Sequence, residues 1–89
     1  MYALVGASKL ESEAGPELAQ SILAGLSQAP GFVSGTFTRS TDGTRGRSMV
    51  LFETEEQAET ARANALANIP DDAPLEIESV EVYEVVAHR

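Results

Sequence analysis

Residues 32–53 read FVSGTFTRSTDGTRGRSMVLFE, and they contain two strand-like runs joined by a turn. The runs Phe32–Ser40 and Arg47–Glu53 are rich in β-branched, aromatic and other apolar residues, which favour strands. Asp42-Gly43 between them is typical of a tight turn, because glycine adopts positive φ without steric cost. The stretch therefore predicts a β-hairpin at mid-chain.

A helix is expected on each side of this hairpin. Before it, acidic residues and a glycine lead to Pro16, which suits the first position of a helix. An apolar stripe at helical spacing follows and stops at Pro30-Gly31. After the hairpin, Thr54 and Gln57 form a capping box for a second helix, which ends before Pro70.

A strand-like run lies beyond each helix, at Tyr2–Lys9 and at Leu75–Ala87. The resulting order, β-α-β-β-α-β, predicts a ferredoxin-like α+β fold with a four-stranded antiparallel sheet and two helices on one face. The apolar residues of the last run change parity near Glu78-Ser79, which predicts a bulge or bend. We expect residues 1–89 to form one domain.

Two features indicate that the sheet meets a second copy of itself. Met49–Phe52 is apolar at four successive positions, so both faces of that strand need cover, whereas the two helices cover one. The last strand, Leu75–Ala87, is too long to pair with the first strand alone, and we expect it to leave its own sheet. An overhanging, partly apolar strand needs a partner.

Composition limits the functional classes. Fourteen acidic residues against six basic ones give a net charge of −8, which repels nucleic acid and anionic lipid. The chain has no cysteine and shows neither a signal peptide nor a membrane span, so we expect a cytoplasmic protein. One histidine and no cysteine also give no metal-site pattern.

The third strand resembles that of an RNA-recognition motif at Arg45, Gly46, Val50 and Phe52. That motif stacks nucleic-acid bases on aromatic side chains of this strand. The positions that would present those rings hold Arg47 and Met49 instead. With the acidic net charge, this makes RNA binding the weakest of the functional hypotheses.

The whole chain resembles the dimeric α/β-barrel proteins, and among them the antibiotic-biosynthesis monooxygenase-like domains. The resemblance lies in Pro30-Gly31-Phe32, in the apolar third strand running into Phe52–Ala58, and in the closing Val82–Val86. In that family two protomers place their sheets face to face to form a barrel. The resemblance therefore implies a homodimer, in agreement with the apolar pattern of the strands.

The resemblance also implies a small-molecule site. Cofactor-independent oxygenases of the family position an aromatic substrate with Asn, Trp, Tyr and Arg side chains, whereas the heme-degrading members use a helical His with Asn and Trp. This chain has no Trp, and its only histidine, His88, is the penultimate residue, so no cofactor is expected. The candidate pocket residues are Tyr2, Phe37, Arg39, Met49, Asn64 and Tyr83.

Several of these residues have a second interpretation. Tyr2 and Tyr83 lie on neighbouring strands and also fit plain core packing. Arg39 and Arg47 would hold an anionic or enolic substrate as pocket residues. As interface residues they would face the glutamate-rich last strand of a second protomer, an interpretation that we prefer. Reversing both charges tests it, because unchanged dimerisation at low salt would count against an interface role.

Three functional hypotheses follow from the sequence. The first is a homodimeric, cofactor-independent, monooxygenase-like enzyme that acts on a small aromatic or polyketide-like molecule. The second is a non-catalytic dimer that binds a small molecule or another protein, and the lack of any clear acid, base or nucleophile favours it. The third is the RNA binder. The sequence does not decide whether the protein is an enzyme, and no catalytic residue is assigned.

Overall fold

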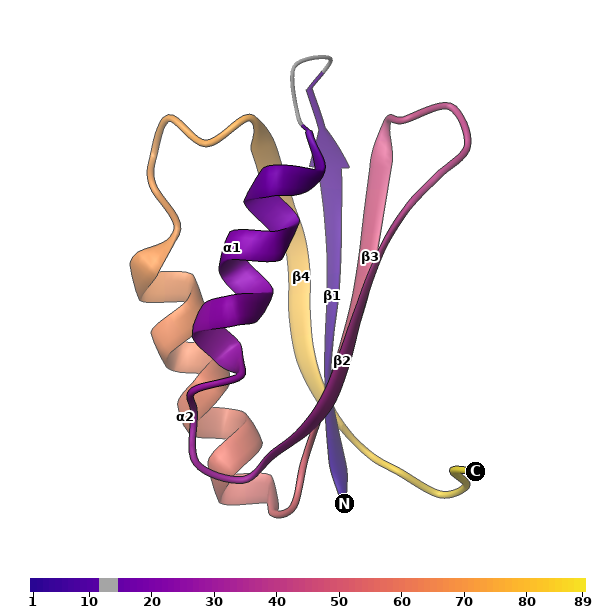
Figure 1. The fold of residues 1–89 in the computed structure, drawn as a ribbon, viewed down its shortest axis with the longest axis vertical. Helices are drawn as coiled ribbons and strands as arrows, with labels where there is room; N and C mark the ends of the chain where they lie inside the picture. Colours follow the sequence, from indigo (N-terminus) through magenta and orange to yellow (C-terminus); the bar gives the residue numbers. More distant parts are fainter. Residues whose placement is uncertain (12–14) are drawn as a thin grey trace.

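The computed structural model describes residues 1–11 and 15–89, and its elements follow the order expected from the sequence. Both helices lie on the same side of a twisted sheet (Figure 1). The acidic stretch expected before the first helix falls partly on residues 12–14, outside the described residues. The elements are β1 (Tyr2–Leu10), α1 (Pro16–Leu26), β2 (Phe32–Arg39), β3 (Arg45–Phe52), α2 (Glu55–Asn68) and β4 (Leu75–Glu84).

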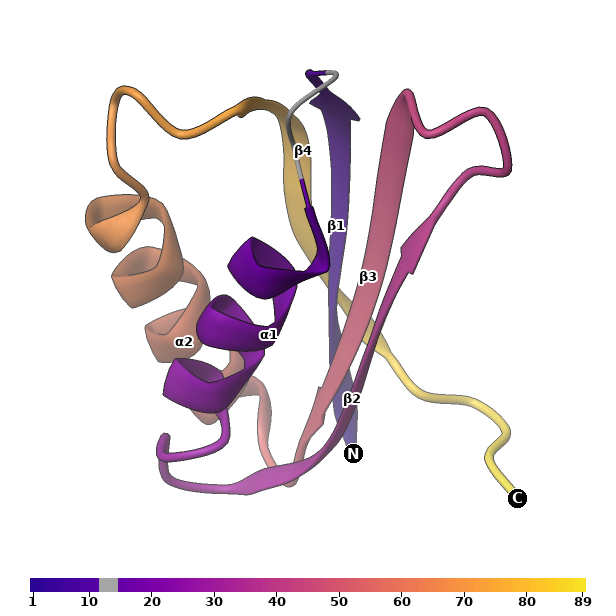
Figure 2. The same cartoon turned by 45° about the horizontal axis from the view of Figure 1, so that its top comes forward.

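The four strands form one sheet in the order β2-β3-β1-β4, and every neighbouring pair is antiparallel. The ferredoxin-like fold with two helices on one face is therefore confirmed (Figure 2). β1 and β3 are the central strands, whereas β2 and β4 are the two edges. The hairpin turn contains Gly43 at a φ of 77°, as the Asp42-Gly43 pair predicts.

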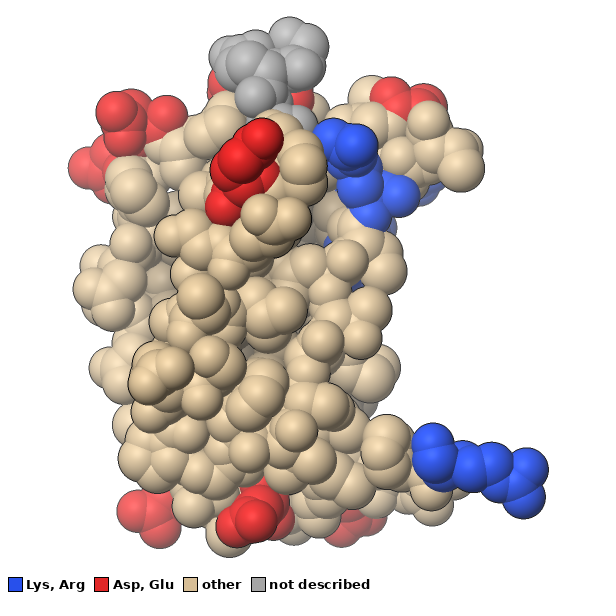
Figure 3. All heavy atoms as spheres, in the orientation of Figure 1, with Lys and Arg blue, Asp and Glu red and all other residues tan. Residues whose placement is uncertain are grey.

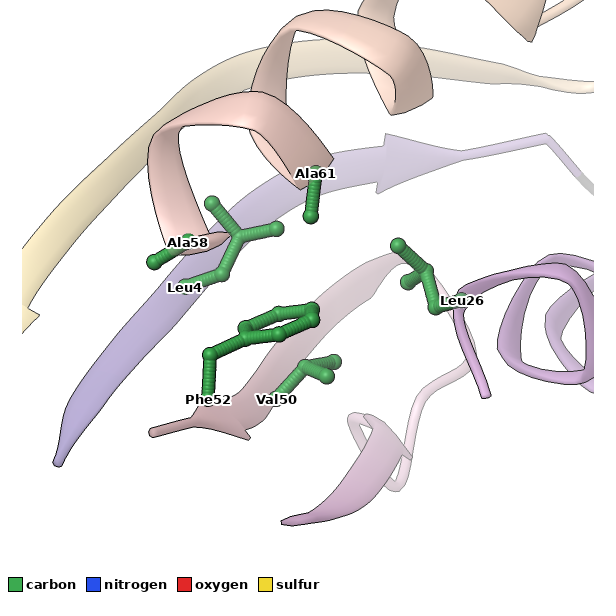
Figure 4. Close-up of a cluster of buried hydrophobic side chains, with 6 residues drawn as sticks. All are labelled: Leu4, Leu26, Val50, Phe52, Ala58 and Ala61. Carbon is green, nitrogen blue, oxygen red and sulfur yellow. The ribbon is translucent and has the colours of Figure 1, made fainter. Parts of the chain in front are cut away.

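The core lies between the helices and the helix-facing side of the sheet (Figure 4). Val50 and Phe52 of β3 are 1% and 0% exposed, and the ring of Phe52 meets that of Phe32 edge to face. Alanines on α2 let this helix approach the sheet closely, because they add little side-chain volume. The buried cluster consists of Leu4, Leu26, Val50, Phe52, Ala58 and Ala61.

The capping box predicted for the second helix is present at the start of α2. The Gln57 N–H donates to Thr54 Oγ1 at 3.2 Å, and the Thr54 N–H donates to Gln57 Oε1 at 3.1 Å. Pro16 is the first residue of α1, as expected. That helix ends at Leu26, earlier than Pro30 suggests, and a turn follows in which the Ser27 hydroxyl donates to the Ala24 carbonyl at 2.7 Å.

The bulge predicted near Glu78-Ser79 is confirmed. Ala7 pairs with Ser79 and Ser8 with Ile77, so that Glu78 is the extra residue of β4. The expected extent of this strand is wrong, because β4 ends at Glu84 rather than Ala87 and pairs with β1 along its length. The chain then leaves the sheet and projects beyond it (Figure 2).

The side of the sheet that no helix covers is also apolar at its centre, and the cover expected for it stays a prediction. We call this side the open face, and its central residues are Ala3, Val5, Met49, Leu51 and Tyr83, which the strand register places side by side. Ala3 and Leu51 are buried. The side chains of Met49 and Tyr83 are 51% and 50% exposed, so about half of each still contacts solvent.

Candidate ligand-binding site

A cavity of about 280 Å³ lies between the helices and the helix-facing side of the sheet. This volume is close to the lower end of the range for small-molecule pockets, roughly 300 Å³. Its described lining comes from both helices and all four strands. The lining residues are Leu4, Gly6, Ala7, Ser8, Leu10, Gly15, Pro16, Leu18, Ala19, Ile22, Leu26, Phe37, Thr38, Arg39, Gly46, Arg47, Ser48, Val50, Ala65, Ile69, Leu75, Ile77 and Val80.

The cavity exists because α1 stands off the central strands and because the residues below it are small. α2 packs against β1, β3 and β4, whereas α1 packs against β2 and α2. The floor of the cavity, on the sheet, is formed by Gly6 and Ser8 of β1 and by Gly46 and Ser48 of β3. The hollow is partly open to solvent, and its volume leaves room for a small ligand.

The walls are apolar and one end is basic. Arg39 and Arg47 are the only ionisable side chains among the described lining residues. The Arg47 guanidinium donates from Nη1 to the Gly46 carbonyl at 2.8 Å. A second depression adjoins the cavity. It is lined by Arg39 and Arg47, as the cavity is, and also by Arg45 of the hairpin. Basic and acidic atoms both lie at this end of the molecule, while the middle of the helix-covered side carries no charge (Figure 3).

The six predicted pocket residues do not come together. Phe37 and Arg39 line the cavity. Tyr2 packs against the buried cluster at the opposite end of β1, and Asn64 is exposed on α2. Met49 and Tyr83 lie on the open face. Tyr2 and Tyr83 thus point to opposite sides of the sheet. A ligand-binding role for the four residues outside the cavity stays a prediction.

The residues that sequence reasoning missed are the two serines of the floor. Ser8 and Ser48 lie at ordinary strand positions and carry no catalytic motif. A signal was nonetheless present, because β1 contains Gly6-Ala7-Ser8 and β3 contains Gly46-Arg47-Ser48. Side chains two positions apart in a strand share a face. The repeated Gly-x-Ser pattern on two paired strands thus predicts a patch of small, hydroxyl-bearing residues.

The hairpin that flanks the basic end is held by Asp42. The hydroxyls of Ser40 and Thr44 each donate to Asp42 Oδ1 at 2.7 Å, and the Thr44 N–H donates at 3.1 Å. These hydrogen bonds, that of Ser40 foremost, lower the pKa of Asp42 from 3.8 to about 2. The carboxylate therefore stays charged and keeps the turn closed at physiological pH.

Residues 1–11 and 15–89 contain no group of three or more His, Cys, Asp or Glu side chains placed to hold a metal ion. Neither helix in those residues has the length and apolar character needed to cross a bilayer.

No protein-family profile and no curated protein sequence matches the chain. Solved structures do match its fold. The heme-degrader MhuD from Mycobacterium tuberculosis, solved with two hemes bound in its active site, superposes with a TM-score of 0.69 at 24% identity, over 100% of this chain and 99% of that one. SnoaB, a cofactor-independent oxygenase from Streptomyces nogalater, superposes with a TM-score of 0.66 at 14% identity, over 98% and 94%.

The second RRM domain of the yeast poly(U)-binding protein Pub1 also matches, with a TM-score of 0.59 at 17% identity, over 99% of this chain and 100% of that one. RRM domains and monooxygenase-like domains share the order of their helices and strands, so the two families are distinguished by the side chains on the sheet. An RRM needs aromatic rings on its sheet face. The open face presents Arg47 and Met49 on β3 and Ala3 and Val5 on β1.

These observations place the chain in the class of ferredoxin-like α+β proteins. Within that class it has the fold of the antibiotic-biosynthesis monooxygenase-like domains, the group that includes MhuD and SnoaB. The resemblance inferred from Pro30-Gly31-Phe32 and the apolar third strand is therefore confirmed at the level of fold.

Proposed function

We propose that this protein is a cytoplasmic homodimer that binds a small aromatic or polyketide-like molecule and oxygenates it without a cofactor. The observation that carries the proposal is the cavity of about 280 Å³ under α1. It combines apolar walls with a basic end, as a pocket for an aromatic anion requires. The fold neighbour SnoaB, a cofactor-independent oxygenase, supports the proposed reaction class.

The lining constrains the substrate. An oxygenase without a cofactor must take the electrons for O₂ reduction from the substrate itself, so the substrate must be electron-rich. The described lining offers no general base, because an arginine stays protonated at all ordinary pH values. The proposed substrate arrives already ionised, as a phenolate or enolate. Arg39, whose strand position faces the helices, would stabilise that negative charge at one end of the cavity.

The same lack of a base supports a second candidate function, ligand binding without catalysis. No described lining residue is a carboxylate, histidine, lysine or tyrosine. The oxygenase and binding functions share the cavity and differ in one measurable respect, namely whether a bound phenolate is consumed by O₂ faster than it is in solution.

Heme, which MhuD binds and degrades, does not fit this site. Protein ligands to heme iron are His, Cys, Met or Tyr, and none of these lines the cavity among the described residues. His88 lies in the segment after β4. We therefore expect that adding heme produces no histidine-ligated absorption spectrum.

A second copy of the chain is the proposed occupant of the open face. The central residues of this face are apolar, yet Met49 and Tyr83 remain about half exposed in one protomer. The two edges of the sheet differ in charge, because Arg39, Arg45 and Arg47 belong to the β2–β3 hairpin and four glutamates belong to β4. Two sheets face to face would cover the apolar patch and bring opposite charges together.

The dimer is tested by placing a charge on the open face. Met49→Glu should shift the protein toward monomer in sedimentation equilibrium, because the glutamate would be buried between two apolar sheets. Leu66→Glu is the matched control, since Leu66 is 42% exposed and lies on α2, away from that face. Both variants should keep a native far-ultraviolet spectrum. Equal dimerisation of the two variants would refute the proposed interface.

The reaction is tested by measuring oxygen uptake with 1,8-dihydroxyanthrone, an electron-rich aromatic acid, in the presence of EDTA. The proposal predicts faster O₂ consumption with the protein than by autoxidation alone. The acceleration should fall in Ser48→Leu, whose larger side chain takes up space on the cavity floor. Binding of the compound without faster uptake would support the non-catalytic function instead.

A further inference from the structure

Half of the basic residues of this acidic chain lie at the hairpin end of the open face. The chain has six lysines and arginines and a net charge of −8. The strand register places Lys9 of β1 directly opposite Arg45 of β3, and Arg47 is two positions further along β3. Residues two apart in a strand share a face, and Met49 of the open face continues the same series. The three cations therefore belong to the side of the sheet that no helix covers.

The charge of this group is not compensated within the described residues. Like charges directly opposite each other on paired strands destabilise a sheet. Glu76 of β4 lies across from Lys9, yet no described carboxylate forms an ion pair with Lys9, Arg45 or Arg47. The charge of Arg45 also acts on Asp42, but Asp42 Oδ1 already accepts three hydrogen bonds within the turn. Such an arrangement of cations points to an anion that would relieve their repulsion.

The second depression, of about 280 Å³, lies beside these arginines, and the hairpin holds its walls in place. Its lining consists of Thr38, Arg39, Ser40, Arg45 and Arg47. The Thr38 hydroxyl donates to the Arg47 carbonyl at 2.8 Å, and the Arg45 N–H donates to Ser40 Oγ at 3.0 Å. The Arg47 guanidinium is itself anchored by its 2.8 Å bond to the preceding carbonyl. Walls that are ordered before binding lose less conformational freedom when a ligand arrives.

We propose that Arg45 and Arg47 bind the phosphate group of a small phosphate monoester in this depression. At about 3.3 Å per residue their Cα atoms are roughly 7 Å apart, so the two guanidinium groups can approach one anion from two sides. A phosphate presents oxygens in several directions, whereas a carboxylate presents two in one plane, and arginine pairs with phosphate in a bidentate manner.

The charge of the whole protein favours a small ligand over a long polyanion. A net charge of −8 repels nucleic acid and anionic membranes, whereas a single phosphate group interacts mainly with the cations next to it. Lys9, which lies opposite Arg45, adds a third positive charge at this place. The inference goes beyond the proposed function, because Arg45 does not line the cavity.

Methyl phosphate and acetate at equal ionic strength separate phosphate recognition from charge screening. The titration is followed by the Nε–H resonances of the arginines at about pH 7.5, where a phosphate ester is mostly dianionic. Methyl phosphate should give saturable shifts at Arg45 and Arg47, and acetate should not saturate. Arg45→Gln and Arg47→Gln should each weaken binding of methyl phosphate about tenfold or more, as expected for hydrogen bonds to a charged group.

Arg89→Gln is the matched control. It removes the same charge at the C-terminus, far from the hairpin (Figure 1), and should leave the affinity for methyl phosphate unchanged. The exposed side chains of Arg45 and Arg47 can be replaced without loss of packing. Arg45→Gln should therefore melt no lower than the wild type in the absence of phosphate, because the substitution removes repulsion from Lys9.

Four results would overturn the inference. The first is equal binding of methyl phosphate to the wild type, Arg45→Gln and Arg47→Gln. The second is tighter binding of a single-stranded oligonucleotide than of methyl phosphate, which would indicate a nucleic-acid surface. The third is tighter binding of inorganic phosphate, which would indicate a site for the free ion. The fourth is binding only to the monomeric Met49→Glu variant, which would show that a second copy of the chain occupies the arginines.

Discussion

Filling the cavity should stabilise the protein and abolish ligand binding at the same time. Ser48→Leu places an isobutyl group on the cavity floor, beside Gly6 and beneath α1. In a close-packed core such an enlargement would cause strain. Here about 280 Å³ of space is available, and the facing residue is a glycine. The added carbons therefore gain contacts with the apolar walls without displacing them.

The size of the effect follows from the buried carbon atoms. At about 0.8 kcal/mol per buried CH₂, the additional carbons of leucine contribute about 2 kcal/mol. For a domain of this size, 1 kcal/mol corresponds to roughly 4–8 °C in melting temperature, so Ser48→Leu should melt roughly 8–16 °C above the wild type. Partial exposure of the new side chain would reduce the gain but would not change its sign.

The assay is thermal unfolding followed by circular dichroism, at equal protomer concentrations because dimerisation makes the melting temperature depend on concentration. Titration with anthraquinone-2-sulfonate accompanies it. Ser21→Leu is the control, since it adds the same carbons at an exposed position on α1 and should gain little. A melting temperature at or below that of the wild type, with probe binding retained, would refute the assignment of the cavity.

Three other outcomes are expected. Thr54→Ala removes the acceptor for the Gln57 N–H and should cost about 1 kcal/mol, measured as a lower urea midpoint. The pKa of Asp42 is lowered from 3.8 to about 2 in the folded state, so its stabilising effect is present above pH 4 and is lost as the pH falls to 2. The wild type should therefore melt above Asp42→Asn at neutral pH, and this difference in melting temperature should shrink between pH 4 and pH 2. A difference that stays constant over this range would contradict the prediction. Arg62→Met breaks the bond from Arg62 Nε to the Val80 carbonyl, 2.6 Å long, and should speed hydrogen exchange near the β4 bulge.

The fold was accessible from sequence because its signals are local. The Asp42-Gly43 turn, the capping box at Thr54 and the apolar run at Met49–Phe52 each depend on neighbours in the chain, and each is present in the structure. The end of β4 was predicted less well. Valines continue past Glu84, but pairing requires a facing strand, and β1 begins at Tyr2. Strand length is thus set by the partner strand.

The residues of the candidate site could be predicted from the sequence only in part. Phe37 and Arg39 were predicted and do line the cavity. Tyr83 and Met49 were chosen for their chemistry, yet register places them on the open face. The face of the sheet on which a side chain lies depends on the pairing of strands that are far apart in the sequence. For this reason the sequence did not show that Tyr2 and Tyr83, on neighbouring strands, point to opposite faces. The floor serines were missed because reasoning about chemistry favours large polar groups over small ones.

The most direct test of the ligand site is a methyl-resonance titration of the wild type with anthraquinone-2-sulfonate. Methyl groups report on one face of a sheet, whereas backbone amides sense both. We expect saturable shifts for Ile22 and Val50, which line the cavity, and none for Met49 and Leu51 on the open face. Shifts confined to Met49 and Leu51, or no shifts at all, would contradict this expectation.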